Sequence, residues 1–70
     1  MMSKVICIAD FTGIVHCDSD WTPNHVEHVQ RGKTVNGVTV ETPSDLVGYV
    51  RIETKTGDYL LVNTEDWVIQ

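Results

Sequence analysis

The dipeptide Asn36-Gly37 stands between two short stretches, residues 34–35 and 38–40, in which threonine and valine alternate. Asn and Gly tolerate the two positive φ angles of a type I′ turn, and the twist of this turn matches the strands that it joins. The motif therefore predicts a two-residue β-hairpin. Its valines would share one face and its threonines the other, as in an antiparallel sheet with one buried side.

Side chains elsewhere in the chain favour the same extended backbone. Val, Ile and Thr make up 24 of the 70 residues, whereas Leu occurs three times and Ala once. β-Branched side chains are stiff at χ1 and fit a pleated surface, and a helical bundle would need the Leu and Ala that are scarce here. Because a chain of this length buries only a modest core, we expect a single, mainly β domain over residues 1–70.

Five further segments have strand patterns, at residues 4–10, 14–17, 46–54, 58–63 and 67–69. The first two are predicted to form a hairpin around Thr12-Gly13. A three-residue loop with Gly57 in the left-handed conformation would pair Thr54 with Asp58. This register places four apolar side chains on one face, those of Val50, Ile52, Leu60 and Val62. A slip by one residue would mix polar and apolar side chains, so this register is favoured.

Residues 23–30 have the signals of a short helix. Thr22 can accept a hydrogen bond as the N-cap, Pro23 suits the first helical position, and Gly32 can end the helix. We therefore expect a small curved sheet or SH3-like barrel of five to six short strands, with one short helix near residues 23–30. The SH3-like shape follows from short strands joined by tight turns and implies no function by itself.

Ten acidic residues outnumber five basic ones, which gives a formal net charge of −5. Proteins that bind nucleic acid use Lys and Arg to neutralise phosphates, so no direct nucleic-acid partner is expected. Residues 5–30 contain four acids and all three histidines but no Lys or Arg. No apolar stretch approaches the roughly 20 residues of a membrane span or the pattern of a signal peptide. These patterns predict a cytoplasmic protein with no membrane partner and with free thiols.

A zinc-stabilised mini-domain is one alternative. Cys7 and Cys17 would lie on the paired strands of the first hairpin, while His25 and His28 would lie one turn apart on the helix, which is broadly a ββα zinc layout. The spacing C-x9-C-x7-H-x2-H matches no common zinc class. Cysteine in an apolar strand also serves as a small hydrophobic residue. We therefore expect no metal and no cofactor.

Catalysis is not expected either. Cys17 could act as a nucleophile with His16 or His25 as its base. His16 and Cys17 are adjacent on a predicted strand, so their side chains point to opposite faces. No third group that would orient a base and no oxyanion-hole motif is recognisable. The chain is therefore predicted not to be an enzyme.

The favoured interpretation is a small acidic binding protein, an inhibitor or adaptor that docks a basic surface of a larger protein. Carboxylates can steer a basic partner and tryptophan is enriched at binding hot spots. One way to do this is nucleic-acid mimicry, as a phage-like inhibitor would. The candidate partner-binding residues are Asp18, Asp20, Trp21, Glu27, Glu65, Asp66 and Trp67.

The alternative from another class is a protein that binds or sequesters a nucleotide-type ligand. Basic and aromatic side chains would hold the ligand between the subunits of a homo-oligomer, which a small core also favours. The candidate ligand-binding residues are Arg31, Arg51, Tyr49 and Tyr59.

Overall fold

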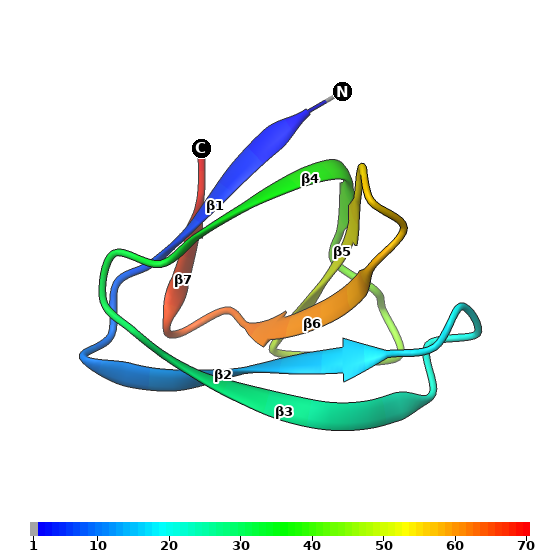
Figure 1. The fold of residues 1–70 in the computed structure, drawn as a ribbon, viewed down its shortest axis with the longest axis horizontal. Coiled ribbons are helices and arrows are strands. Elements are labelled where there is room, and N and C mark those ends of the chain that lie inside the picture. Colours follow the sequence, from blue (N-terminus) through cyan, green and yellow to red (C-terminus); the bar gives the residue numbers. More distant parts are fainter. Residues whose placement is uncertain (1) are drawn as a thin grey trace.

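Seven antiparallel strands form one sheet in the computed structural model, which describes residues 2–70 (Figure 1). The strands are β1 (Ser3–Cys7), β2 (Phe11–Cys17), β3 (Pro23–Gln30), β4 (Thr34–Glu41), β5 (Tyr49–Thr54), β6 (Tyr59–Asn63) and β7 (Trp67–Ile69). Their order across the sheet is β3-β2-β6-β5-β4-β1-β7. The described residues include no helix, and hence none with the length and apolar character that crossing a bilayer needs.

The sheet is rolled around one core, as the nearly equal dimensions of 29 × 25 × 24 Å indicate. Val29 of β3 and Trp67 of β7 belong to the same buried cluster, although β3 and β7 are the two edges of the sheet. Near these edges the Thr12 hydroxyl donates a hydrogen bond of 2.7 Å to Asp66 Oδ2. The mainly β prediction is thus confirmed. The SH3-like barrel is not confirmed, because the sheet stays unclosed between β3 and β7.

The predicted hairpin at Asn36-Gly37 is wrong, because β4 runs straight through both residues. Asn36 lies opposite Lys4 of β1, while Gly37 lies opposite Thr54 of β5 next to a bulge. Glycines with positive φ among residues 2–70 are Gly32, Gly48 and Gly57. Gly37 is needed for space instead, since a Cβ there would lie 2.8 Å from methyl carbons of both Ile52 and Val40.

The predicted helix at residues 23–30 is also wrong, because this segment is β3 and pairs with β2 along its length. A two-turn helix is unstable without packing, and its Val and His residues are poor helix formers. β2 offers the same residues a full ladder of backbone hydrogen bonds. A helix would have placed Val26 and Val29 on one face, because they are three residues apart. In the strand, Val29 points into the core and Val26 points outward.

The predicted hairpin of residues 4–10 and 14–17 does not form. β1 pairs with β4 and β7, while β2 pairs with β3 and β6. Thr12-Gly13 lies inside β2 and the chain turns at residues 8–10 instead. Cys7 and Cys17 are consequently on strands that are not neighbours.

The β5–β6 hairpin agrees with the sequence in its loop and its register. Gly57 has a φ of 84°, and the Thr54 amide donates to the Asp58 carbonyl at 3.0 Å. The four side chains predicted to share a face are all buried in the core: Val50, Ile52, Leu60 and Val62. The last strand is also confirmed at residues 67–69. This hairpin fixes which β5 and β6 side chains point outward, and these build the candidate site.

Candidate functional site

The outer face of β2, β6 and β5 carries a row of side chains that alternate with the core residues. Cys17 lies opposite Tyr59, which lies opposite Glu53, and Leu61 lies opposite Arg51. Leu61 is only 5% exposed although it lies outside the core cluster. Side chains on the outer face must therefore cover it, which is unusual for the solvent side of so small a sheet.

Trp21 lies in the turn between β2 and β3 and reaches back onto this face. Its ring meets the Tyr59 ring edge to face, with centroids 5.1 Å apart and an interplanar angle of 89°. The Arg51 guanidinium lies 5.2 Å from the centroid of the Trp21 ring, in cation–π geometry. Among residues 2–70, the buried Nε of Arg51 has no hydrogen-bond partner. The three side chains form one aromatic and cationic cluster.

The backbone of Trp21 is in the left-handed region, with a φ of 66°. A bulky residue rarely adopts this conformation, which costs about 1–3 kcal/mol. The turn is fixed around it by hydrogen bonds: the Trp21 amide donates to the Asp18 carbonyl at 2.8 Å, and the Asp18 amide donates to the Thr22 carbonyl at 2.9 Å. The fold thus holds the indole in place at a cost to the backbone.

Carboxylates lie in the turn that holds Trp21 and beside Arg51. Asp20 Oδ1 accepts from the Thr22 amide at 3.1 Å, and hydrogen bonds from Thr22 lower the pKa of Asp20. Asp45 Oδ2 lies 4.0 Å from Arg51. Burial and the charge of Asp18 raise the pKa of the Cys17 thiol. We call this surface the Trp21 face; it comprises Trp21, Tyr59, Arg51, Asp18, Asp20, Asp45 and Glu53.

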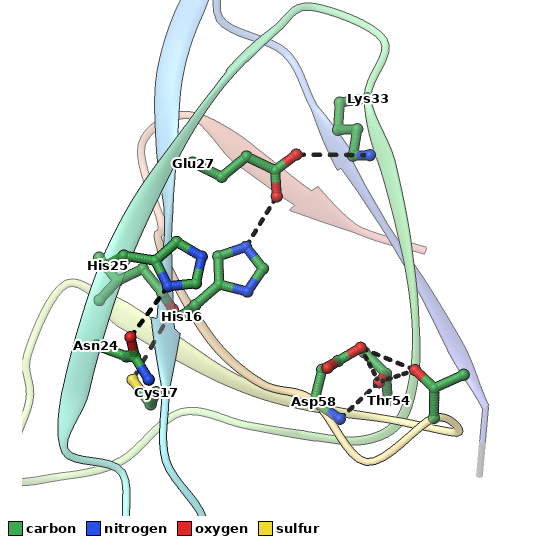
Figure 2. Close-up of polar contacts among 10 residues, drawn as sticks. His16, Cys17, Asn24, His25, Glu27, Lys33, Thr54 and Asp58 are labelled. Carbon is green, nitrogen blue, oxygen red and sulfur yellow. Dashed lines mark hydrogen bonds and ion pairs between the residues drawn. The ribbon is translucent and has the colours of Figure 1, made fainter.

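A second polar group lies on the inner side of the β2–β3 hairpin (Figure 2). His16 Nε2 donates to Glu27 Oε1 at 2.8 Å, and Lys33 Nζ lies 4.0 Å from Glu27 Oε2. The hydrogen bond from His16 is the main reason that the pKa of Glu27 is lowered. His25, opposite His16, stacks on it with ring centroids 4.5 Å apart. Figure 2 shows Glu27 of β3 and Lys33, in the turn before β4, pointing toward each other.

The acids before Trp67 lie in the turn between β6 and β7. Asp66 Oδ2 accepts from Thr12 and from Asn63 Nδ2, at 2.7 and 2.9 Å, and these hydrogen bonds lower its pKa. Trp67 is buried in the core, while Glu65 is exposed. The carboxylate of Asp66 thus fastens the end of the sheet.

The structure therefore divides the predicted partner-binding set. Asp18, Asp20 and Trp21 come together on the Trp21 face. Glu27 lies on the inner side of the hairpin, and residues 65–67 lie beyond the far end of β6. Residues 65–67 are separated from the Trp21 face by the length of β6, which is about 13 Å. Sequence reasoning missed Asp45 and Glu53, although the correctly predicted β5–β6 register already placed Glu53 beside Tyr59.

The predicted ligand-binding set is also divided. Arg51, Tyr49 and Tyr59 all occupy outward positions of β5 and β6. Arg31 lies between β3 and β4, where its Nε donates to Asp10 Oδ1 at 3.0 Å. The Trp21 face therefore includes two of these four residues, Arg51 and Tyr59.

The four zinc candidates are dispersed. Cys7 is buried in the core, and Cys17 lies beside Tyr59 on the outer face. His25 stacks on His16, whereas His28 is stacked on Phe11 across the sheet from it. Over residues 2–70, no group of three or more His, Cys, Asp or Glu side chains could hold a metal ion. The predicted ββα layout is wrong because it required a hairpin and a helix that do not form.

Of the three polar groups, the Trp21 face combines an aromatic pair, a cation and several acids on the outside of the sheet. The function proposed for this chain is inferred from these side chains. A scan against protein-family models and searches of curated proteins and of solved structures found no match to this chain.

Proposed function

We propose that this chain is a small non-catalytic binding protein, an inhibitor or adaptor that docks a basic segment of a larger protein on the Trp21 face. The observation that carries this proposal is the position of Trp21. A large indole is held on the outer surface at positive φ, with two acids in its own turn and a third beside Arg51. Gly or Asn would occupy the same backbone conformation at lower cost, so the side chain itself is what the turn preserves.

The charge around Trp21 fits a basic partner. Asp18, Asp20, Asp45 and Glu53 supply four carboxylates against the single guanidinium of Arg51. This excess attracts Lys and Arg side chains during encounter, while a tryptophan that is already held in place gives up little entropy on contact. The Arg51–Trp21 pair illustrates how a guanidinium contacts this ring.

The experiment is an NMR titration of the isotope-labelled chain with a synthetic peptide of alternating Lys, Arg and Gly. We expect the largest shifts at the Trp21 indole and at the Asp18 and Asp20 amides. Binding should weaken steeply as salt rises toward about 1 M, where the Debye length falls to about 3 Å. Shifts spread evenly over the molecule, or affinity that does not respond to salt, would contradict the proposal.

Matched variants sharpen this test. Trp21→Gly removes the indole and relieves the backbone, so it should stay folded and lose affinity by about 30-fold, as expected for a hot spot of about 2 kcal/mol. The Asp18 carboxylate accepts a hydrogen bond from Asn24 Nδ2 at 3.0 Å, and that of Asp20 accepts one from the Thr22 amide. Asp18→Asn and Asp20→Asn keep an accepting oxygen in each place and remove only the charge. Glu65→Gln removes an acid at the far end of β6 and is the control. Equal losses in Glu65→Gln and Asp20→Asn would count against a localised site.

A nucleotide-type ligand is the second candidate, and the orphaned Nε of Arg51 favours it. The Arg51 guanidinium lies over the Trp21 ring, which in turn contacts Tyr59, and a cation beside aromatic rings is the combination that a phosphate and a base would need. A thermal-shift assay with a nucleotide panel separates the two candidates, since a ligand that binds only the folded chain raises its Tm. A nucleotide that raises the Tm of the wild type but not of Arg51→Gln would replace the basic partner with this ligand.

A further inference from the structure

The free edge of β3 is the longest unpaired edge of the sheet. β3 spans eight residues and is bonded to β2 on one side only, whereas β7, at the other edge, has three residues. Figure 1 shows β3 as the outermost ribbon beside β2. Six of its eight residues are exposed, among them Val26, which is 51% exposed. Backbone groups along such an edge can pair with a further strand.

The residues of β3 indicate which partner strand, and in which register, can pair with its free edge. In an antiparallel pair between two copies of β3, related by a twofold axis, residues opposite each other must point to the same face. With the axis at Val26, the two Val26 side chains meet on the outer face. His25 of one copy then lies opposite Glu27 of the other, and this contact occurs twice.

Neighbouring registers lack this complementarity. An axis at Glu27 would oppose two carboxylates, and an axis at His25 would place Glu27 opposite Pro23 of the second copy. Like charges directly opposite each other destabilise a strand pair, while opposite charges contribute about 0.2–1 kcal/mol. The Val26 register is the one with an apolar pair at its centre and an imidazole opposite a carboxylate on both flanks.

The outer face of β2 and β3 also carries exposed apolar and aromatic side chains. Phe11 is 65% exposed and stacks on His28, with ring centroids 5.3 Å apart, and both lie on the outer face with Val26. We propose that β3 pairs with β3 of a second copy of this chain in the Val26 register, forming a continuous sheet through both copies.

The interface is small. Eight residues from each copy fall well below the roughly 20–30 residues per side of a standard stable interface. The dimer is therefore a weak one, which forms and dissociates over the micromolar range and above. This proposal does not rest on the function proposed for the Trp21 face.

The first experiment uses sedimentation equilibrium over a range of concentrations, with two charge variants. His25→Glu would place two carboxylates opposite each other, and Glu27→Lys would place a lysine opposite His25. Each variant alone should dimerise about tenfold more weakly than the wild type. Mixed together they are complementary again, because Glu at position 25 then faces Lys at position 27, so a heterodimer should form. A mixture no heavier than its separate components would overturn the proposal.

The second experiment tests the register by oxidation, in a Cys17→Ser background that leaves Cys7 buried. Val26→Cys places two thiols opposite each other across the axis, and we expect a cross-linked dimer. His28→Cys is the control, because its two thiols would be about 14 Å apart. A cross-link in His28→Cys but not in Val26→Cys would refute this register. The dimer would be refuted if the wild type stays monomeric at millimolar concentration. It would also be refuted if the measured mass corresponds to a complex of this chain with a different protein.

Discussion

Gly37→Ala separates the structural role of Gly37 from the role that its sequence motif suggests. The added Cβ would lie 2.8 Å from Cγ2 of Ile52 and 2.8 Å from Cγ2 of Val40. Favourable carbon contacts lie at about 3.5–4.0 Å, so each contact is too close by about 0.7 Å or more. Ile52 is 0% exposed and has no free space to move into. The core must therefore shift, or the bulge in β4 must open.

Overpacking of this kind costs about 1–3 kcal/mol. A domain of this length has a total stability on the order of 4–10 kcal/mol, so the variant should lose a large share of it. A loss of 1 kcal/mol lowers the Tm of a small domain by about 4–8 °C, and we expect a fall of about 4–20 °C. Urea denaturation, monitored by circular dichroism, measures the same loss of stability as a shift in the midpoint concentration of urea.

Two comparisons test the reasoning. In a type I′ turn, Gly37→Asn would be tolerated better than Gly37→Ala, because Asn adopts positive φ more readily. In the extended β4, Gly37→Asn should be less stable than Gly37→Ala, because the Asn side chain is larger than that of Ala. Val40→Ala removes one of the two close methyl groups, so Gly37→Ala should cost about 1 kcal/mol less in that background. A Gly37→Asn variant more stable than Gly37→Ala would refute the assignment of Gly37 to a crowded strand.

Two further predictions concern titrating groups. Because the pKa of Asp66 is lowered in the fold, its hydrogen bonds stabilise the fold at a pH above the unfolded pKa of about 3.9. This stabilisation is lost as the pH falls through the folded pKa. The urea midpoints of the wild type and Asp66→Asn should therefore differ most above about pH 5 and converge near pH 2. The raised pKa of Cys17 owes part of its shift to Asp18, so Asp18→Asn should speed alkylation of Cys17 by iodoacetamide at about pH 8, while Glu65→Gln leaves the rate unchanged.

The sequence was sufficient for the fold where local pattern and tertiary pairing coincide. The β5–β6 hairpin is such a case: its turn chemistry at Gly57 and its alternation of Val50 and Ile52 with polar residues demand the same register. The short strand after Asp66 was predictable for the same reason, since a tight turn separates two apolar segments.

Elsewhere the local signals were ambiguous and long-range pairing decided the outcome. Asn36-Gly37 can form a turn, but β1 and β5 offer β4 partners on both of its sides. Pro23 suits the start of a strand at a sheet edge as well as it suits a helix. Thr12 looks like a turn residue, yet it is buried in β2 and bonded to Asp66, a partner 54 positions away. None of these partners can be identified from a window of neighbouring residues.

The same limit applies to the charge. Along the chain, Glu27 and Asp66 belong to the acidic surroundings of the two tryptophans. In the fold, Glu27 is bonded to His16 and Asp66 to Thr12 and Asn63, so both carboxylates stabilise the sheet. Asp20 accepts a hydrogen bond only within its own exposed turn and remains available beside Trp21. The net charge of −5 therefore overstates the acidic surface open to a partner, and the part of it that can act together is the group around Trp21.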